Sequence, residues 1–391
     1  MTGRDMKYRQ FGKLGWEVSS LDFGCMRLPT TDGFMISANV DEAEAIRMIR
    51  RGIDEGINYV DSAYPYHMGN SQVVVGKALK DGYREKVKLA TKSPVWQVKK
   101  AEDFDTYLNE QLGRLQTDHL DFYLLHGLDA RLWKSMLDLD VMARAEAAVR
   151  DGRIGHIGFS FHDVFDAFKE IVDGYDGWAM CLIQHNYMDI ENQAGTEGLR
   201  YAASKGLAVA IMEPLLGGNL ARPPEDVKRL FADYDPERSP AEWALLWLWN
   251  QPEVSVVLSG MSAMEQVEDN LRFADRSGVN TMSEEELQVI DRVREAYGKK
   301  AAIACTQCGY CMPCPNGLDI PQNMQLYNQG LMYDELVMPR FVYFQRLAED
   351  ARAGACTDCK ECEEKCPQGL PISEWMPRIH AVLGEGKPYE S

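Results

Sequence analysis

Residues 56–79, GINYVDSAYPYHMGNSQVVVGKAL, join a short apolar run to a helical pattern, and this unit decides the fold. The run NYVDSA (58–63) predicts a strand, because it is short, apolar and followed by turn residues. The same alternation recurs along the chain. Residues 41–55, for example, place Ala45, Ile46, Ile49 and Ile53 at helical spacing. Strands are predicted at 20–25, 58–63, 87–93, 119–126, 154–160, 180–186, 207–213 and 254–260.

Eight such units within about 290 residues indicate an α/β fold of the (β/α)8 TIM barrel type rather than an open doubly wound sheet. The segment MKYRQFGKLGWEVSSL (6–21), with Gly12 and Gly15 at turns, predicts a hairpin that covers the bottom of the barrel. The barrel domain is predicted to span residues 1–297.

Eight of the ten cysteines form two runs, CTQCGYCMPC (305–314) and CTDCKECEEKC (356–366), and a proline follows each run. Gaps of two residues let successive thiolates surround one iron–sulfur cluster, and in two-cluster ferredoxins the fourth cysteine binds the other cluster. One 4Fe–4S cluster is therefore assigned to Cys305, Cys308, Cys311 and Cys366. The second is assigned to Cys356, Cys359, Cys362 and Cys314.

A zinc alternative would use two paired-thiol sites, but it leaves the regular spacing of the third and fourth cysteines unexplained. The residues between the two runs have helical character, which is similar to the helical ferredoxin modules attached to larger oxidoreductases. Residues 298–391 are therefore predicted to form a small, mostly helical ferredoxin-like domain with two clusters.

The net charge of −18 argues against nucleic acid or an anionic membrane surface as a partner, because both attract positive proteins. The first 25 residues lack the apolar core of a signal peptide, and the most apolar stretch (241–250) is too short to span a bilayer. A cytoplasmic location is expected. Thiols stay reduced there, so clustered cysteines bind metal more often than they form disulfides.

Polar residues at the ends of predicted strands are the candidates for chemistry, since loops at the carboxyl ends of strands form the active site of such a barrel. The segment at the end of the second strand offers Asp61 and Tyr66, and the ends of the third and fourth strands offer Lys92 and His126. A tyrosine beside a lysine cation is expected to lose its proton more easily than usual. Such a tyrosine can donate a proton to a carbonyl oxygen, which a neutral histidine can orient.

These segments resemble the aldo-keto reductase family. GINYVDSAYPYHMGNSQVVVGKAL, KLATKSP and DFYLLHG are similar to the family's Asp–Tyr, Lys and His segments. The resemblance implies a catalytic tetrad of Tyr66, Asp61, Lys92 and His126, with Tyr66 as acid and base. It also implies that Ser160 and Gln184 hold a nicotinamide carboxamide. The segment SGMSAMEQVEDN is similar to the family's adenosine-holding segment, with Gly260, Gln266 and Asn270 as cofactor-binding residues.

The chain departs from the family at three cofactor-binding positions. Met212 stands where an aromatic side chain commonly stacks on the nicotinamide, and Phe161 replaces a frequent asparagine. Residues 260–270 contain no Lys or Arg, so they lack a cation for the 2′-phosphate of NADP, and their acidic residues suit a free ribose hydroxyl better. Trp96, Trp133 and Phe161 are candidate walls of the substrate pocket.

Three functions are consistent with this pattern. The first is an iron–sulfur oxidoreductase that interconverts a carbonyl and an alcohol on a small molecule, with clusters that carry electrons. It would use NAD(P), a flavin or a redox partner protein, because a cluster moves one electron and a hydride carries two. The second is a plain NAD(P)H-dependent reductase with structural or sensing clusters. The third is an electron-transfer subunit with a non-catalytic barrel.

Overall fold

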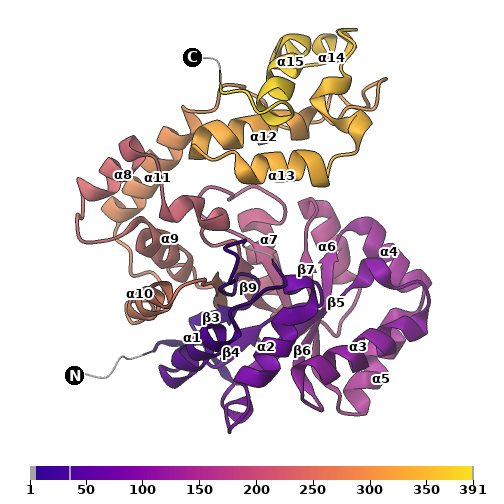
Figure 1. Cartoon of the computed structure of the whole chain (residues 1–391), viewed down its shortest axis with the longest axis vertical. Coiled ribbons are helices and arrows are strands. Elements are labelled where there is room, and N and C mark those ends of the chain that lie inside the picture. Colours follow the sequence, from indigo (N-terminus) through magenta and orange to yellow (C-terminus); the bar gives the residue numbers. More distant parts are fainter. Residues whose placement is uncertain (1–5, 35–36, 390–391) are drawn as a thin grey trace. The chain divides into compact units, whose positions relative to one another are not determined.

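The computed structural model describes residues 6–34 and 37–389, and it divides into two compact units (Figure 1). The first unit contains Met1–Gly217 and Ala241–Glu284, and the second contains Gly218–Pro240 and Glu285–Ser391. The outer limits predicted for the two domains, residues 1 and 391, lie outside the described residues.

The first unit is a closed barrel of eight parallel strands, which confirms the predicted fold class. The strands follow the chain order around the barrel, and the last pairs with the first. Each of them overlaps one of the eight predicted runs. They are β3 (Leu21–Gly24), β4 (Tyr59–Asp61), β5 (Lys88–Ser93), β6 (Leu120–Leu128), β7 (Ile154–Phe161), β8 (Met180–Gln184), β9 (Ala208–Met212) and β10 (Val256–Gly260).

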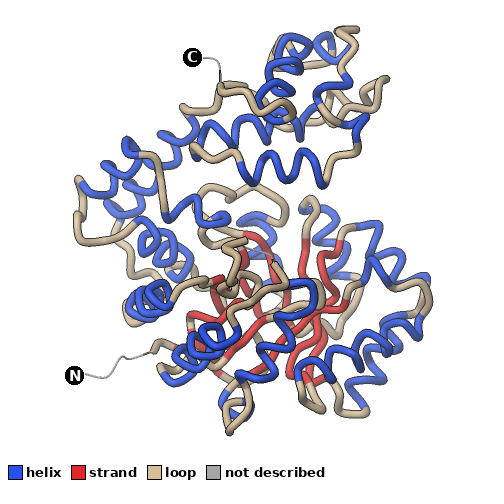
Figure 2. Tube along the Cα trace, in the orientation of Figure 1, coloured by secondary structure: helices blue, strands red, loops and turns tan. Residues whose placement is uncertain are grey.

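Helices surround these strands, as Figure 2 shows. Helix α1 begins where the Asp41 carboxylate accepts a hydrogen bond from the Glu44 N–H, and it buries Ala45, Ile49 and Ile53. The helices of this unit are α1 (Glu42–Asp54), α2 (Asn70–Ala78), α3 (Ala101–Leu115), α4 (Ala130–Asp138), α5 (Val141–Arg150), α6 (Phe165–Asp173), α7 (Gly195–Ser204), α9 (Pro240–Trp249) and α10 (Met264–Ala274).

A hairpin closes the amino-terminal end of the barrel, as the sequence predicts. Strands β1 (Tyr8–Gln10) and β2 (Glu17–Ser19) pair antiparallel, and the connecting turn carries Phe11. The Phe11 ring lies 5.1 Å from the Phe122 ring inside the barrel. Gly12 adopts a φ of +55°, and a Cβ atom there would lie 2.5 Å from the Ala208 backbone nitrogen. Glycine therefore lets this turn approach the strand end closely.

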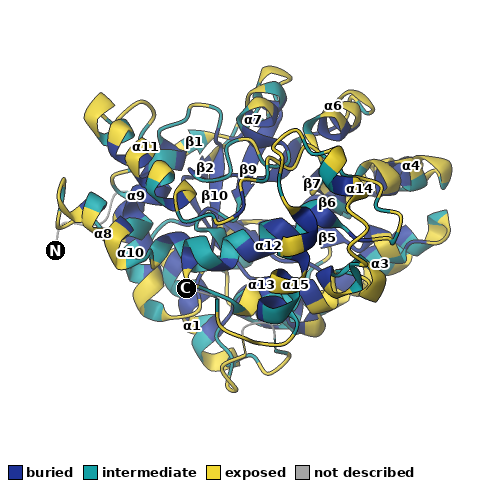
Figure 3. Ribbon diagram, turned by 90° about the horizontal axis from the view of Figure 1, so that it is seen from above, coloured by how far each residue is buried: buried dark blue, intermediate teal, exposed yellow. Residues whose placement is uncertain are grey.

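Alternate residues of each strand face two different environments. On β5, Leu89 packs in the outer core between strands and helices, whereas Ala90 packs in the barrel interior. The strands are buried on both sides, as their dark blue colour shows in Figure 3. This alternation directs inward-facing polar side chains at the carboxyl ends of the strands toward one site.

The second unit is mostly helical and has its own apolar core. Its helices are α8 (Glu225–Ala232), α11 (Glu284–Gly298), α12 (Ile320–Tyr333), α13 (Val337–Gln345), α14 (Glu361–Glu364) and α15 (Ile372–Leu383). Ion pairs of Arg238 with Glu286 at 2.6 Å and of Lys300 with Asp226 at 2.9 Å join residues 218–240 to α11 and to the residues just after it. The compact units therefore divide the chain differently from the predicted boundary at residue 297. No helix among the described residues is long and apolar enough to cross a membrane.

Candidate active site and cluster-binding cysteines

Polar side chains from neighbouring strands meet at the carboxyl end of the barrel. β4 ends at Asp61, the adjacent strand β5 carries Lys92, and both side chains are buried. The Lys92 ammonium donates a hydrogen bond to the Asp61 carboxylate. It also donates to the Ser62 carbonyl oxygen at 3.0 Å and to the Tyr66 hydroxyl at 3.2 Å. All three N–H groups of the ammonium are therefore used.

The predicted histidine lies next to this group. His126 on β6 presents its ring edge-on to Tyr66, with the ring centroids 6.0 Å apart and the planes at 85°. Its Nδ1 atom is buried and has no hydrogen-bond partner among the described residues. Burial lowers the pKa of His126 well below its usual value, and the charge of Lys92 lowers it further. His126 is therefore neutral at neutral pH and can form a hydrogen bond to a substrate oxygen.

The acidity of Tyr66 differs from the expectation. Burial raises the pKa of Tyr66, and the opposing effect of the Lys92 cation does not overcome it. Lys92 stays charged, because the Asp61 carboxylate and Tyr66 raise its pKa by more than burial lowers it. The prediction that Tyr66 loses its proton more easily than usual is wrong for this pocket, and Tyr66 is protonated at neutral pH.

His67 fixes the turn that carries Tyr66, and sequence reasoning missed it. It lies within the 3-10 helix η1 (Tyr66–Gly69) at a φ of +51°. Its Nδ1–H donates to the Ser37 carbonyl oxygen at 2.7 Å, and its Nε2 accepts from the Leu28 N–H at 3.1 Å. The ring thereby ties the loop after β3 to the residue beside Tyr66.

Three predicted cofactor-binding residues lie at the carboxyl ends of β7, β8 and β9. The Ser160 hydroxyl accepts a hydrogen bond from the Gly127 N–H at 2.7 Å. The Gln184 side chain donates to Asp189 at 2.7 Å and accepts from Gln193 at 3.1 Å, so its amide orientation is fixed. Met212 is the β9 partner of Gln184. The three side chains therefore line adjacent strand ends.

The predicted adenosine-holding residues lie at the end of β10 and in α10. Asn270 donates to the Ser259 hydroxyl at 2.8 Å, and Gln266 accepts from the Ser262 N–H at 2.8 Å. A Cβ atom at Gly260 would lie 3.2 Å from Cδ of Arg27. The loop after β3 thus brings a cation to a segment that has none of its own.

Arg27 also contacts the loop after β9. It donates to the Gly217 carbonyl oxygen at 3.1 Å and pairs with Glu213 at 3.7 Å. Two of the three acidic residues of the segment are paired as well, since Glu268 binds Arg51 at 2.7 Å and Asp269 binds Arg272 at 2.8 Å. The preference for a free ribose hydroxyl was inferred from the charges of residues 260–270 alone. That inference left out the arginine side chains that other parts of the chain bring to this segment.

Of the three aromatic residues predicted to line the pocket, only Trp96 is suitably placed. Its ring lies 5.2 Å from His126, and 39% of its surface is exposed. Phe161 and Trp133 are buried among helices, where their rings pack 5.1 Å from Phe168 and 5.6 Å from Trp178 respectively. The prediction that Phe161 and Trp133 line the pocket is wrong.

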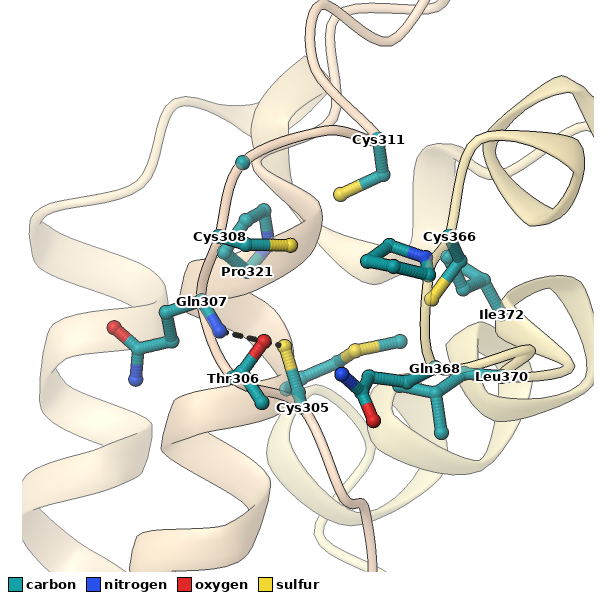
Figure 4. Close-up of a pocket in the computed structure, with 13 residues that line it drawn as sticks. Cys305, Thr306, Gln307, Cys308, Cys311, Pro321, Cys366, Gln368, Leu370 and Ile372 are labelled. Atoms are coloured by element: carbon teal, nitrogen blue, oxygen red, sulfur yellow. Dashed lines mark hydrogen bonds between the residues drawn. The ribbon is translucent and has the colours of Figure 1, made fainter.

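Cysteines from both runs surround one pocket in the second unit (Figure 4). The pocket is lined by Cys305, Cys308, Cys311 and Cys366. Apolar side chains, including Met324 and Ile372, complete its wall, and the Gln307 N–H donates to the Cys305 sulfur at 3.4 Å. This is the crossed group that the spacing predicts. Four thiols around one apolar pocket with an N–H···S bond fit a 4Fe–4S cluster.

The residues just after Cys314 contact the second cysteine run. Asn316 comes two residues after Cys314 and donates to the Cys359 sulfur at 3.9 Å and to the Thr357 hydroxyl at 2.8 Å. The end of the first run therefore lies against the second run. Burial raises the pKa of Cys362 to about 11, and the neighbouring Cys356 and Cys359 contribute to that shift. That these thiols bind a second cluster stays a prediction.

Comparison with known protein families settles the class of the barrel. The model described as "Aldo/keto reductase family" matches residues 20–295. The chain belongs to the aldo/keto reductase family. The model described as "4Fe-4S dicluster domain" matches residues 304–370 of this reductase, which favours iron–sulfur over the zinc alternative. The protein is thus an aldo/keto reductase-type oxidoreductase with a 4Fe–4S domain.

Relatives of this aldo/keto reductase match about three quarters of the chain. The uncharacterized oxidoreductase YrpG of Bacillus subtilis (strain 168) is 27% identical over an alignment of 313 residues, and the match covers 70% of this chain and 92% of the relative. The holo structure of aldo-keto reductase AKR11C1 from Bacillus halodurans has a TM-score of 0.62 and 28% identity, over 74% of this chain and 96% of that one. A Klebsiella pneumoniae aldo-keto reductase in complex with NADPH has a TM-score of 0.59 at 24% identity, over 74% and 95%.

Replacing Asn316 of this reductase by Leu is expected to lower the reduction potential of one cluster, because hydrogen bonds to cluster sulfur raise the potential. The shift should be tens of millivolts. A hydrogen bond contributes about 1 kcal/mol, and for a one-electron couple a tenfold change in equilibrium constant corresponds to about 59 mV. Redox titration followed by electron paramagnetic resonance measures it. Gln368, which lines the pocket of Cys305, Cys308, Cys311 and Cys366, provides the control. Equal shifts of the same cluster in Asn316→Leu and Gln368→Leu would contradict the assignment.

Proposed function

We propose that the protein interconverts a carbonyl and an alcohol on a small molecule, with Tyr66 as proton donor and acceptor. The observation that carries this proposal is the Lys92 ammonium, which binds both the Asp61 carboxylate and the Tyr66 hydroxyl beside a neutral His126. A buried cation at a tyrosine hydroxyl stabilises the phenolate that forms when the proton leaves.

Each member of this group has one task in carbonyl reduction. Tyr66 gives its proton to the carbonyl oxygen as that oxygen gains electron density. Lys92 stabilises the resulting phenolate, and Asp61 keeps Lys92 charged in a buried position. His126 forms a hydrogen bond to the same carbonyl oxygen and orients it, because a neutral imidazole can donate without adding charge.

A nicotinamide cofactor fits the strand ends beside this group. Ser160, Gln184 and Met212 would hold the nicotinamide, and the fixed Gln184 amide suits a carboxamide partner. Gly260, Gln266 and Asn270 would hold the adenosine, and Arg27 would face the phosphates. The structurally similar Klebsiella pneumoniae aldo-keto reductase in complex with NADPH and the Arg27 cation support a phosphorylated cofactor, NADP. When bound, the cofactor supplies hydride to the carbonyl carbon.

We further propose that the eight cysteines hold two 4Fe–4S clusters that carry electrons to or from the barrel reaction. Two observations support this proposal: Cys366 lines the pocket of Cys305, Cys308 and Cys311, and Asn316, just after Cys314, donates to the Cys359 sulfur. Clusters transfer single electrons, so a bound flavin or a redox partner protein would link them to a two-electron reaction. The geometry of Lys92 and Tyr66 disfavours a barrel without catalysis.

One anaerobic experiment tests this function. The purified protein should contain about eight irons and eight sulfides per chain, and flavin is assayed at the same time. Nicotinamide absorbance and cluster absorbance are then followed together while aldehydes and ketones are added. We expect carbonyl-dependent oxidation of NADPH and a coupled change in the cluster signal. Turnover without a cluster response would support a plain reductase, and cluster chemistry without turnover would support an electron-transfer subunit.

A further inference from the structure

A second carboxyl group lies inside the barrel close to the Asp61–Lys92 pair. Asp22 is the middle of the sequence Leu21–Asp22–Phe23 on β3, and its two neighbours pack in the outer core. Strand alternation therefore directs Asp22 inward, and the residue is 0% exposed. Gly24, two residues later, pairs with Asp61 on β4, so the two carboxyl groups are diagonal neighbours on the inner face.

The surroundings of the Asp22 carboxyl stabilise a negative charge by less than burial destabilises it. Neither of its oxygens has a hydrogen-bond partner among the described residues. Lys92 is the cation that acts on it, but the three N–H groups of Lys92 already bind Asp61, Ser62 and Tyr66. An isolated buried carboxylate costs several kcal/mol or more, so such a group takes up a proton instead.

The other groups around Asp22 do not change this conclusion. From β4, the Tyr59 hydroxyl donates to the Met180 sulfur at 3.4 Å, and just after β3 the Cys25 thiol donates to the Phe23 carbonyl oxygen at 3.6 Å. Burial and then the Asp61 charge raise the pKa of Asp22 well above its usual value. Lys92 and the β10 backbone N–H of Ser259 oppose that rise without cancelling it.

We propose that Asp22 is a positioning residue for proton transfer, whose uncharged carboxyl leaves Asp61 as the single anion beside Lys92 and keeps Tyr66 a competent acid. This inference rests on the proposed role of Tyr66. When Asp22 loses its proton, a second negative charge joins the group, and the phenolate of Tyr66 becomes harder to form. Carbonyl reduction should therefore decline as the pH rises through the ionisation of Asp22.

Infrared spectroscopy of the substrate-free holoprotein tests the protonation state directly. The wild-type protein should show the carbonyl stretch of a protonated carboxylic acid at neutral pH, and Asp22→Asn should lose this band. Asp121→Asn is the matched control, because the buried Asp121 carboxylate is bound by Lys88, the Leu89 N–H and Arg84, each at 2.9 Å. The band should persist in that variant. A wild-type protein without the band would overturn the proposal.

The pH profile of carbonyl reduction provides the second measurement, with the carbonyl compound that supports turnover in the assay above. Asparagine resembles the uncharged acid but cannot ionise. The alkaline decline should therefore move to higher pH by about one unit in Asp22→Asn, which is tenfold in proton affinity, and stay in place in Asp121→Asn. Identical profiles for the wild type and Asp22→Asn would refute the role. The two failures can be told apart, because the infrared band reports on Asp22 without turnover. If the band is present but Tyr66 proves to have no role in turnover, the proposed function fails and the protonated state of Asp22 stands.

Discussion

Replacing Tyr66 by Phe is expected to slow carbonyl reduction by about 10²- to 10⁴-fold, the usual contribution of a positioned general acid. The phenylalanine ring keeps the packing of tyrosine and its edge-on contact with His126, while the hydroxyl that lies 3.2 Å from the Lys92 nitrogen is lost. The rate constant kcat measures this effect. The affinity for NADPH, measured by fluorescence titration, should not change, because the hydroxyl acts on the substrate oxygen.

Tyr64→Phe is the matched control for that variant. Tyr64 is two residues away, and its hydroxyl donates to the Glu110 carboxylate at 3.3 Å on the exposed side of the turn. Removing that hydroxyl should leave turnover unchanged. If Tyr66→Phe reduced carbonyl compounds at the wild-type rate, another group would have to supply the proton, and Tyr66 would have no role in the chemistry.

The barrel could be predicted because its strands carry the same two-sided pattern. In β5, Leu89 faces the outer core and Ala90 the interior, and comparable runs recur eight times between helical segments. Strand ends were predicted less well: residues 58–63 were expected as a strand, whereas β4 stops at Asp61. There the chain turns into the segment that carries Tyr66, and local propensity does not show where pairing stops.

The residues of the catalytic group could be predicted from the sequence, but the burial and hydrogen bonding of their side chains could not. Parallel strands place Asp61, Lys92 and His126 at one end of the barrel whatever the loops do. The pKa direction of Tyr66 depends on burial, which the surrounding loops decide. The left-handed backbone of His67 and the approach of Arg27 to Gly260 also depend on loop conformation.

One error and one omission could have been avoided from the sequence. Phe161 follows the inward-facing Ser160, so alternation places Phe161 on the outer side, where it is fully buried. The same rule applied to β3 places Asp22 in the barrel interior. A charged residue at an inward position of an otherwise apolar strand is a signal of a buried polar group.

The crossed arrangement of the cysteines gives the other large expected effect. Cys366→Ala should lose the cluster held by the first run, because Cys366 lines the pocket of Cys305, Cys308 and Cys311. Iron content should fall from about eight to about four per chain. Cys181→Ala, which removes a thiol buried in the barrel strand β8, is the control and should keep all its iron.

The identity of the cluster that remains in each variant shows whether the fourth cysteine of each run binds the cluster of the other run. Asn316 donates to the Cys359 sulfur, so Asn316→Leu reports on the cluster of the second run. In a Cys366→Ala background, the remaining cluster should still shift its potential when Asn316 is replaced. In a Cys314→Ala background, the remaining cluster should be insensitive to Asn316. The reverse pattern would mean that each run binds its own cluster, because the fourth cysteine of a run would then serve the three that precede it.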